Sequence, residues 1–356
     1  MNTSIDCASL RQWFLEEQRL LPWRLDRTPY AVWVSEIMLQ QTQVAVVIPY
    51  FERWMQRFPT VRHLAEASID EVIKIWEGLG YYSRARYLHA GARYVLERHN
   101  GVIPDSEEEL KMIKGLGPYT IGAIRSFAFH QRSAAVDGNV LRVLTRYLMI
   151  EEDISQPKTV NAIRELALTL LPQEESWVIT EALIELGATV CTRKPKCGDC
   201  PLRKSCQSYI RGDAARLPYK SKKTSIEVLH RAVAVVRWQD KLLVRRGQQG
   251  EIMSDLYEFP YFESQASGAD SAEMAANIRK RFDFETLYDK KLERVAHSFT
   301  RYRVHLEPIQ FICRSRTRPQ LIPHHQWLSP AELQRVAFSS GHRRIFQGLD
   351  ENFEAS

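Results

Sequence analysis

The 356-residue sequence lacks the features that mark secreted and membrane proteins. Its first 18 residues, MNTSIDCASLRQWFLEEQ, contain no cationic start followed by an apolar core, so we expect no signal peptide. The longest stretch of low charge, residues 29–51, contains Glu36, three glutamines and Pro49. These residues argue against a membrane span and for a buried core helix. We therefore predict a cytoplasmic protein that spans no membrane.

Cysteine is scarce, and four of the six cysteines fall within residues 191–206. In a cytoplasmic protein such crowding indicates metal binding before disulfides. Four thiolates can complete either one zinc site or one [4Fe–4S] cluster, and spacing does not choose between them. The predicted ligands are Cys191, Cys197, Cys200 and Cys206.

Strand patterns are missing before residue 226, where helical periodicity prevails. After that point residues 231–247 predict two strands joined by a tight turn at Gln239–Asp240, and residues 304–313 predict another strand. The sequence thus predicts an all-α domain followed by a smaller α+β domain. Their bounds are 1–216 for the helical domain, 217–225 for a basic linker and 226–350 for the α+β domain.

Positive charge is concentrated in one segment. The net charge is +6, but residues 191–223 hold ten Lys or Arg against two Asp, which leaves 39 basic and 41 acidic residues elsewhere. A basic segment on a near-neutral body indicates a polyanionic partner. A solvated linker explains Lys220, Lys222 and Lys223 equally well, but not the charges among the cysteines.

Glu36 is the single charge in the apolar stretch 29–51. A carboxyl group without hydration keeps its proton to higher pH and can act as a general acid. The alternative is a glutamate at the exposed end of a buried helix, or one paired with an arginine. The stretch alone does not decide between the two.

Residues 110–124, LKMIKGLGPYTIGAI, predict two helices joined by a Gly-x-Gly turn. Gly115 and Gly117 allow positive φ and close backbone approach, and Pro118 suits the first position of the second helix. Free N–H groups at that position can bind a phosphate. A plain helix turn is the alternative, and we favour phosphate binding.

Two further motifs carry polar or exposed side chains. Asp137 and Asn139 precede a predicted helix, where an acid is usually an N-cap; a functional role gains weight from Glu36 in the same domain. The glycine-rich loop 76–86 carries Leu79 and Tyr81, which could wedge into a base stack. Ordinary core packing is the alternative for the tyrosines of this loop.

Taken in order, these motifs resemble one known family. LPWR, PYAVWVSEIMLQQTQV, WEGLGYYSRAR, GLGPYTIGA, VDGNVLRVLTR, EALIELGATVC and the four-cysteine loop recur in adenine DNA glycosylases of the MutY type, within the helix-hairpin-helix glycosylase superfamily. The likeness covers about residues 5–225. It implies two helical lobes with the active site in the cleft between them, and removal of adenine mispaired with 8-oxoguanine.

The resemblance assigns roles to individual residues. Glu36 corresponds to the acid that protonates the flipped adenine at N7, and Asp137 to the carboxylate that stabilises the cationic sugar. Asn139 and Tyr119 correspond to residues that orient Asp137. Tyr119 also stands where bifunctional relatives carry a Schiff-base lysine, so no efficient β-lyase step is expected. The remaining correspondences are Trp23, Arg24 and Glu181 for the adenine pocket, and Gln41, Leu79 and Tyr81 for the strand that holds 8-oxoguanine.

The same resemblance selects [4Fe–4S] over zinc and identifies residues 226–350 as a Nudix-like domain that reads 8-oxoguanine. YEFP at 257–260 supports this, but residues 226–356 contain no Glu-Glu pair, so pyrophosphohydrolase activity is not expected. Two departures stand out. The first cysteine gap has five residues where the family has six, and the Phe-Ser-His hairpin tip reads Phe299-Thr300-Arg301.

We therefore predict a monofunctional adenine DNA glycosylase that acts as a monomer on double-stranded DNA with A:8-oxoguanine or A:G mispairs. Its expected location is the bacterial cytoplasm, at the nucleoid. Tyr119 and the second domain disfavour an endonuclease III-like glycosylase/lyase. The pair of acids, Glu36 and Asp137, disfavours a catalytically silent lesion binder. The missing acidic pair disfavours a Nudix hydrolase.

Overall fold

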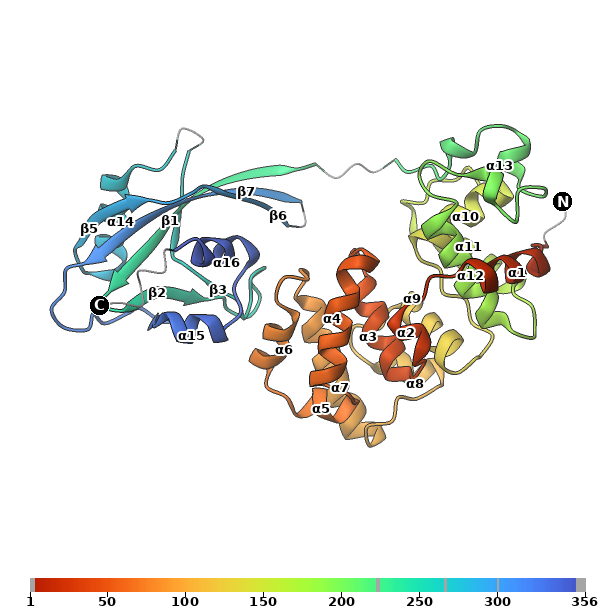
Figure 1. Cartoon of the computed structure of the whole chain (residues 1–356), viewed down its shortest axis with the longest axis horizontal. Coiled ribbons are helices and arrows are strands. Elements are labelled where there is room, and N and C mark those ends of the chain that lie inside the picture. Colours follow the sequence, from red (N-terminus) through yellow and green to blue (C-terminus); the bar gives the residue numbers. More distant parts are fainter. Residues whose placement is uncertain (1–3, 222–224, 266–267, 300, 350–356) are drawn as a thin grey trace. The chain divides into compact units, whose positions relative to one another are not determined.

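The computed structural model describes residues 4–221, 225–265, 268–299 and 301–349 (Figure 1). It divides into two compact units. One unit comprises Met1–Glu66 and Tyr87–Lys223, and the other comprises Ala67–Arg86 and Thr224–Ser356. Each unit is described by itself.

Helices build the first unit, and the described residues before 226 contain no strand. The helices are α1 (Cys7–Glu17), α2 (Pro22–Leu25), α3 (Pro29–Leu39), α4 (Val44–Arg57), α5 (Val61–Glu66), α7 (Ser83–His99), α8 (Glu107–Met112), α9 (Pro118–Ala123), α10 (Gly138–Leu148), α11 (Pro157–Leu170), α12 (Ser176–Thr189) and α13 (Gln207–Ile210). A π-helical turn, Ile124–Ala128, continues α9, and 3₁₀ turns lie at Cys197–Asp199 and Ala214–Arg216. Among the described residues of both units, no helix is long and apolar enough to cross a membrane.

The apolar stretch 29–51 forms two helices, so the prediction of one continuous core helix was wrong. α3 ends at Leu39, α4 begins at Val44, and Gln41 between them has a φ of +59°. Four consecutive polar residues, QQTQ at 40–43, leave no apolar face to bury at this point. α3 itself is buried from Tyr30 to Met38 and packs against α4, α9 and the π-helical turn. Burial of α3 on most sides is what removes Glu36 from solvent.

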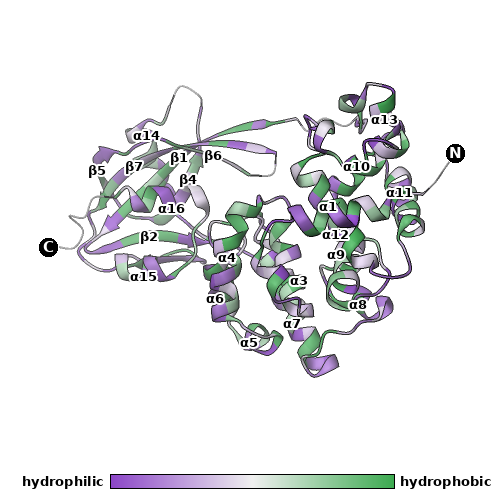
Figure 2. Cartoon of the chain, turned by 45° about the vertical axis from the view of Figure 1, so that its right-hand side comes forward, coloured by the Kyte–Doolittle hydropathy of each residue, from purple (hydrophilic) through white to green (hydrophobic). Residues whose placement is uncertain are grey.

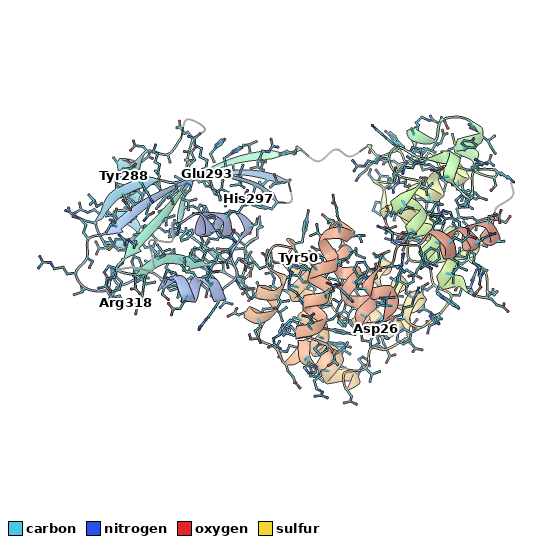
Figure 3. The ribbon with its side chains drawn as sticks, in the orientation of Figure 1. Asp26, Tyr50, Tyr288, Glu293, His297 and Arg318 are labelled. Atoms are coloured by element: carbon cyan, nitrogen blue, oxygen red, sulfur yellow. The ribbon has the colours of Figure 1, made fainter. Side chains whose placement is uncertain are left out.

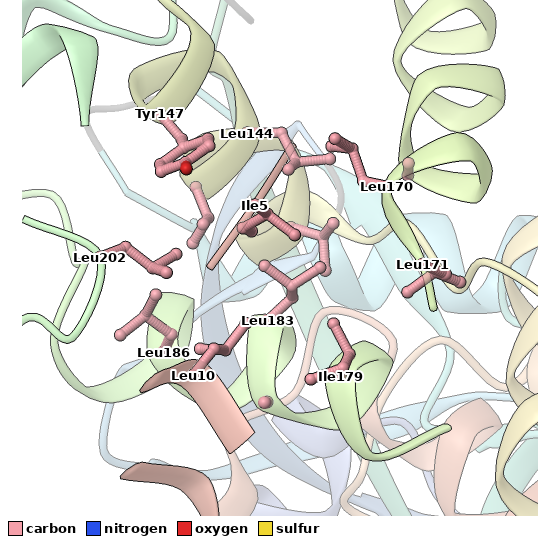
Figure 4. Packing of buried hydrophobic residues seen from close by; sticks show 14 of the residues in the cluster. Ile5, Leu10, Leu144, Tyr147, Leu170, Leu171, Ile179, Leu183, Leu186 and Leu202 are labelled. Atoms are coloured by element: carbon pink, nitrogen blue, oxygen red, sulfur yellow. The ribbon is translucent and has the colours of Figure 1, made fainter. Parts of the chain in front are cut away.

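The N-terminal helix packs against the last helices of the first unit. A cluster of buried hydrophobic side chains joins α1 with α10, α11 and α12 (Figure 4). Leu10 of α1, Leu144 of α10, Leu170 of α11 and Leu183 of α12 belong to it, and Leu202 joins from the cysteine loop. This core fixes the start of α10 relative to α12, and both helices contribute to the site described below.

The second unit contains one mixed sheet. The described strands are β1 (Glu227–Trp238), β2 (Lys241–Arg246), β3 (Tyr257–Glu258), β4 (Tyr261–Glu263), β5 (Thr286–Lys291), β6 (Val295–Phe299), β7 (Tyr302–Cys313) and β8 (His325–Leu328). The order is β3-β2-β1-β7-β5, and β4, β6 and β8 pair with β1, β7 and β2. β1 and β7 run parallel. β5 carries Tyr288 and β6 carries His297 (Figure 3).

Helices cover both faces of this sheet, as the alternation of side chains along β1 requires. Ala234 and Val236 pack with residues of α14 (Ser271–Phe282), whereas Val233 and Val235 pack with residues of α15 (Pro330–Arg335) and α16 (Ser340–Gln347). The middle of β2, Leu242–Val244, is hydrophobic and buried, whereas its two ends are charged (Figure 2). The predicted turn at Gln239–Asp240 joins β1 to β2, where Trp238 pairs with Lys241. The predicted fold class, an all-α domain plus a smaller α+β domain, is confirmed.

The second unit also includes a piece of the helical chain. α6 (Ile69–Trp76), the loop that follows it and the first turn of α7 cluster with residues 224–356. Ion pairs Arg246–Asp70 (2.6 Å) and Arg86–Asp255 (3.5 Å) contribute to this association. The glycine-rich loop is therefore built into the same unit as the sheet.

Candidate active site

A cavity of about 490 Å³ in the first unit collects side chains from α2, α3, α9, α10 and α12. These helices come from separate stretches of the chain, so the fold gathers residues that the motifs singled out independently. The predicted site residues that line the cavity are Trp23, Arg24, Glu36, Gln41, Tyr119, Asp137, Asn139 and Glu181.

Glu36 is 6% exposed and faces this cavity from the last turn of α3. Burial raises the pKa of Glu36 to about 7 against the lowering effect of a hydrogen bond from Tyr119, and the nearby carboxylates Asp137 and Glu181 add to the rise. In the described part of the chain Glu36 is neither exposed nor ion-paired with an arginine. Near neutral pH a large fraction of this carboxyl group is protonated, as a general acid requires.

Tyr119 donates its hydroxyl proton to Glu36 Oε2 at 2.5 Å. Burial raises the pKa of Tyr119, and the charges of Glu36 and Asp137 raise it further, so the phenol remains protonated. Because a hydroxyl has one proton to donate, Tyr119 holds Glu36 in this arrangement. The orientation of Asp137 rests on Asn139 instead.

Asp137 is both an N-cap and a wall of the cavity. Its Oδ1 accepts hydrogen bonds from the backbone N–H groups of Asn139 (2.9 Å) and Val140 (2.8 Å), and its Oδ2 accepts one from Asn139 Nδ2 (2.7 Å). Burial raises the pKa of Asp137, while these bonds oppose the rise. The N-terminus of α10 adds a favourable dipole for negative charge. The two interpretations of Asp137, cap and functional acid, are thus compatible in one geometry.

Asn139 is itself held by a residue that the motifs did not single out. Arg142 donates from Nη2 to Asn139 Oδ1 (2.8 Å) and to the carbonyl oxygen of Gly187 (2.6 Å). A Cβ atom at Gly187 would lie 2.6 Å from the Asn139 Cβ, so glycine allows α12 to approach α10 this closely. The spacing Asn139-x-x-Arg142 on a helix is the sequence signal that could have revealed this contact.

The α12 side of the cavity carries two glutamates paired with arginines. Glu181 accepts from Arg27 Nη1 at 2.6 Å and lies 3.5 Å from Arg24 Nε. Glu185, one turn further, is fully buried and accepts from Arg19 Nε (2.6 Å) and Arg24 Nη2 (2.9 Å). Burial raises the pKa of Glu185, but both arginines outweigh it and the pKa lies below its usual range.

Arg19, Arg27 and Glu185 were missed by the sequence reasoning, although all three line the cavity. The signal was present as acids at i and i+4 on α12, matched by a run of arginines around α2. Trp23, which was predicted for the adenine pocket, is buried and contacts the Phe51 ring edge-on at 5.4 Å between centroids. Gln41 stands exposed at the rim, in the turn between α3 and α4.

The predicted helix–turn–helix is present, with different roles for its two glycines. Gly115 has a φ of +94°, and a Cβ atom there would lie 2.5 Å from the Tyr87 Cβ, so the position requires glycine. Gly117 is the N-cap of α9 with a φ of −97°, so it does not use its freedom to adopt positive φ. Neither residue lines the cavity.

The four clustered cysteines line a separate small hollow with Arg146 and Tyr209. All four are free thiols, and the Arg146 guanidinium lies 3.4 Å from Cys191 Sγ. No group of three or more His, Cys, Asp or Glu side chains within the described ranges is placed to hold a metal ion. A zinc ion would draw all four sulfurs to about 2.3 Å from one point. Four cysteine thiols around one hollow are the donor set that either a zinc ion or a [4Fe–4S] cluster would use.

The remaining predicted residues lie in the second unit. Tyr81 is 40% exposed with a φ of +49° and lines a hollow of about 540 Å³ together with Phe299 of β6. Leu79 is 5% exposed, so it packs inside the unit and does not protrude as a wedge. Arg301, at the hairpin tip, contacts Tyr302 Oη (3.0 Å). Thr300 lies outside the described residues.

Known proteins resemble both parts of the chain. Residues 34–168 match the family model of HhH-GPD superfamily base excision DNA repair proteins, and residues 232–348 match that of the NUDIX domain. The chain is 33% identical to an adenine DNA glycosylase from Rattus norvegicus, over 97% of this chain and 78% of the rat protein. It is 34% identical to an adenine DNA glycosylase from Buchnera aphidicola subsp. Baizongia pistaciae, over 74% and 75% of the two chains.

Among solved structures, a thermostable thymine-DNA glycosylase shares 27% identity at a TM-score of 0.53, over 57% of this chain and 94% of that chain. This likeness places the helical part in a known DNA glycosylase fold. The relatives that match across both the helical and the sheet-containing parts are adenine DNA glycosylases. The chain therefore belongs to the adenine DNA glycosylase family.

Proposed function

We propose that this chain is a monofunctional DNA glycosylase that hydrolyses the N-glycosidic bond of a flipped adenine mispaired with 8-oxoguanine or guanine. The observation that supports this most directly is the buried Glu36, hydrogen-bonded to Tyr119 and with a pKa of about 7, in one cavity with Asp137. Glycosidic cleavage through a cationic sugar uses an acid and a carboxylate in unlike environments.

In the proposed reaction, protonated Glu36 gives its proton to adenine N7, so that the base departs neutral. Positive charge then develops at C1′ of the sugar, and Asp137 stabilises it before water adds. Asn139 keeps Asp137 in place through the 2.7 Å bond. Trp23, Arg24 and Glu181 form the wall against which the base lies.

The cavity supports a monofunctional enzyme. A Schiff-base β-lyase needs an amine that can attack C1′. No lysine lines the cavity among the described residues, and the position expected for it holds Tyr119, whose proton is engaged with Glu36. Base removal without strand cleavage follows.

Recognition of the opposite base is assigned to the second unit. The 540 Å³ hollow between Tyr81 and Phe299 offers two aromatic rings and the hydroxyl of Ser298 near the hairpin tip. We place the strand carrying 8-oxoguanine here, in contact with Tyr81, Phe299 and Arg301. Leu79 and Thr300 stay predicted contacts of this strand. Gln41 at the rim of the adenine cavity and the Gly115–Gly117 turn are proposed contacts to the DNA strand.

A [4Fe–4S] cluster bound by Cys191, Cys197, Cys200 and Cys206 would cross-link residues 191–206 and hold their basic side chains in a fixed arrangement. The local charge balance of +8 over residues 191–223 suits a phosphate backbone. We propose 1–216 as the glycosylase domain, 217–225 as linker and 226–350 as the lesion-reading domain. The expected form is a monomer in the bacterial cytoplasm, at the nucleoid.

Single-turnover assays on four duplexes test the proposed activity. We expect adenine release from A:8-oxoguanine and, less selectively, A:G, and none from A:T or from thymine glycol opposite A. Strand breaks should require alkali. Breaks without alkali, or release of thymine glycol, would instead identify an endonuclease III-like glycosylase/lyase.

A further inference from the structure

The loop that carries Tyr81 has three residues with left-handed backbone torsions. Gly78, Gly80 and Tyr81 all take positive φ, at 98°, 75° and 49°. Within the loop, Trp76 Nε1 and Arg84 Nη2 donate to the carbonyl oxygen of Gly80, at 3.0 and 3.1 Å. These bonds fix the turn itself, but they do not fix the loop relative to the sheet.

Glu77, at the start of this loop, is one of the residues that attach the loop to the sheet-containing part of the unit. Its Oε1 accepts from the backbone N–H of Phe338 (2.9 Å) and from Arg343 Nε (2.7 Å). Its Oε2 accepts from Arg343 Nη2 (3.2 Å) and from Lys74 Nζ (2.7 Å). The carboxylate thus has four donors, three of them from residues about 260 positions later in the chain. The Glu77 and Arg343 side chains are only 16% and 12% exposed, so solvent screens this ion pair weakly.

The segment that Glu77 binds, residues 338–340, contributes both to the hydrophobic core of the second unit and to the hollow that Tyr81 lines. The Phe338 ring is fully buried among the aromatic residues under the sheet, and its backbone bridges to Tyr257. The next residues, Ser339 and Ser340, line the hollow opposite Tyr81. Glu77 therefore joins the loop that presents one wall of the hollow to the segment that forms another.

We propose that Glu77 is a positioning residue that sets mispair preference, because it holds Tyr81 at a fixed distance from the sheet that reads the oxidised base. This inference rests on the proposed function. Loss of the hydrogen bonds made by Glu77, which we call the clamp, should leave the proposed adenine cavity intact. None of the residues that line this cavity belongs to the second unit. The expected defect is in discrimination between 8-oxoguanine and guanine.

The test compares Glu77→Gln with Asp70→Asn in the full chain. Asp70 lies on the same α6 and pairs with Arg246, but its side chain is 60% exposed, which makes it a matched control. Single-turnover rates are measured on A:8-oxoguanine and A:G duplexes. For Glu77→Gln the ratio of the two rates should fall by about tenfold, from the loss of a charge-assisted bond. Asp70→Asn should leave the ratio within about twofold.

Two further measurements separate positioning from general destabilisation. Amides of residues 78–82 should exchange faster in Glu77→Gln while those of α3 and α10 do not. In a double-mutant cycle with Arg343→Gln, the double variant should lose no more discrimination than either single variant. An unchanged rate ratio, or an equal fall on both duplexes, would overturn the role of Glu77. Absence of adenine release by the unmodified chain would instead overturn the proposed function, and the exchange of residues 78–82 would still decide whether the clamp exists.

Discussion

The α3 and α12 sides of the cavity in the first unit hold buried glutamates whose pKa values are shifted in opposite directions. Glu36 on α3 has a phenol as its partner, and burial raises its pKa to about 7. Glu185 on α12 is buried at least as deeply, yet two arginines keep its pKa below the usual range. Burial alone therefore does not make a glutamate a proton donor. The partner decides, because a neutral donor tolerates the protonated form whereas guanidinium groups favour the anion.

The opposite pKa shifts of Glu36 and Glu185 suggest a separate task for each side of the cavity, which we call the α3 wall and the α12 wall. The α3 wall can supply a proton at neutral pH. The α12 wall is a network in which Glu181 and Glu185 form ion pairs with three arginines. Such a network can orient a base by hydrogen bonds without exchanging protons with it. The following substitutions change one wall at a time.

The largest effect is expected for Glu36→Gln. Glutamine keeps the shape and can still accept from Tyr119, but it has no acidic proton, so adenine release should slow by at least about 100-fold. Duplex binding, measured by gel shift or fluorescence anisotropy, should stay within a few fold. Glu181→Gln is the matched change on the opposite wall and should reduce the rate less. A Glu36→Gln enzyme that releases adenine at the normal rate would remove this residue from the acid role.

Asp137→Asn comes next. Asparagine caps a helix about as well as aspartate, so the free energy of unfolding should change by less than about 0.5 kcal/mol. The negative charge facing the sugar is lost, and the single-turnover rate should fall by about 100-fold. Asp137→Ala serves as the companion variant, because it removes the cap as well and should cost about 1 kcal/mol of stability. If both variants keep activity and only Asp137→Ala loses stability, Asp137 is only a cap.

The sequence revealed the members of the α3 wall better than those of the α12 wall. Glu36 is the single charge in the apolar stretch 29–51, so the sequence alone shows that it lacks charged neighbours there. The pairing of Glu185 with Arg19 and Arg24 joins residues more than 160 positions apart, so the spacing of the acids on α12 does not say which arginines they meet. Tyr119 was predicted to orient Asp137, but the direction of its hydroxyl depends on how α3 packs against α9.

The same limit applies to the fold. Periodicity located the helices and the β1–β2 turn, because both follow from neighbouring residues. It did not reveal that α3 and α4 are separate, since the apolar content of 29–51 hid the polar QQTQ break. Nor could it reveal that α6 and Glu77 associate with the sheet, because those contacts lie with residues 336–343. Long-range ion pairs contribute to the association of α6 and Glu77 with the sheet, and sequence spacing does not record them.

Glu185→Gln should weaken the fold more than it weakens chemistry. Removing this member of a buried ion pair takes the Glu185 counter-charge from Arg19 and leaves Arg24 with Glu181 at 3.5 Å, at a cost of about 3 kcal/mol. Denaturant unfolding of the full chain, followed by the helical signal at 222 nm, measures the loss. Because the pKa of Glu185 is lowered in the folded state, its contribution is present above the ordinary glutamate pKa and is lost on acidification. The difference between the two proteins should therefore shrink as pH falls. A constant difference would mean that Glu185 acts through shape and not through charge.

The smallest change, Tyr119→Phe, tests whether the phenol tunes Glu36. The Tyr119 hydrogen bond lowers the pKa of Glu36, which burial has raised to about 7, so its removal should raise that pKa further. In the proposed reaction protonated Glu36 is the active form, so the rate should fall as pH rises through its pKa. In the variant this fall should occur at higher pH, with little change in the plateau rate at lower pH. The measurement is a single-turnover pH–rate profile under subsaturating enzyme, which reports the free protein. A shift to lower pH would show that Tyr119 stabilises the protonated acid. The raised pKa of Glu36 would then come from the phenol as well as from burial.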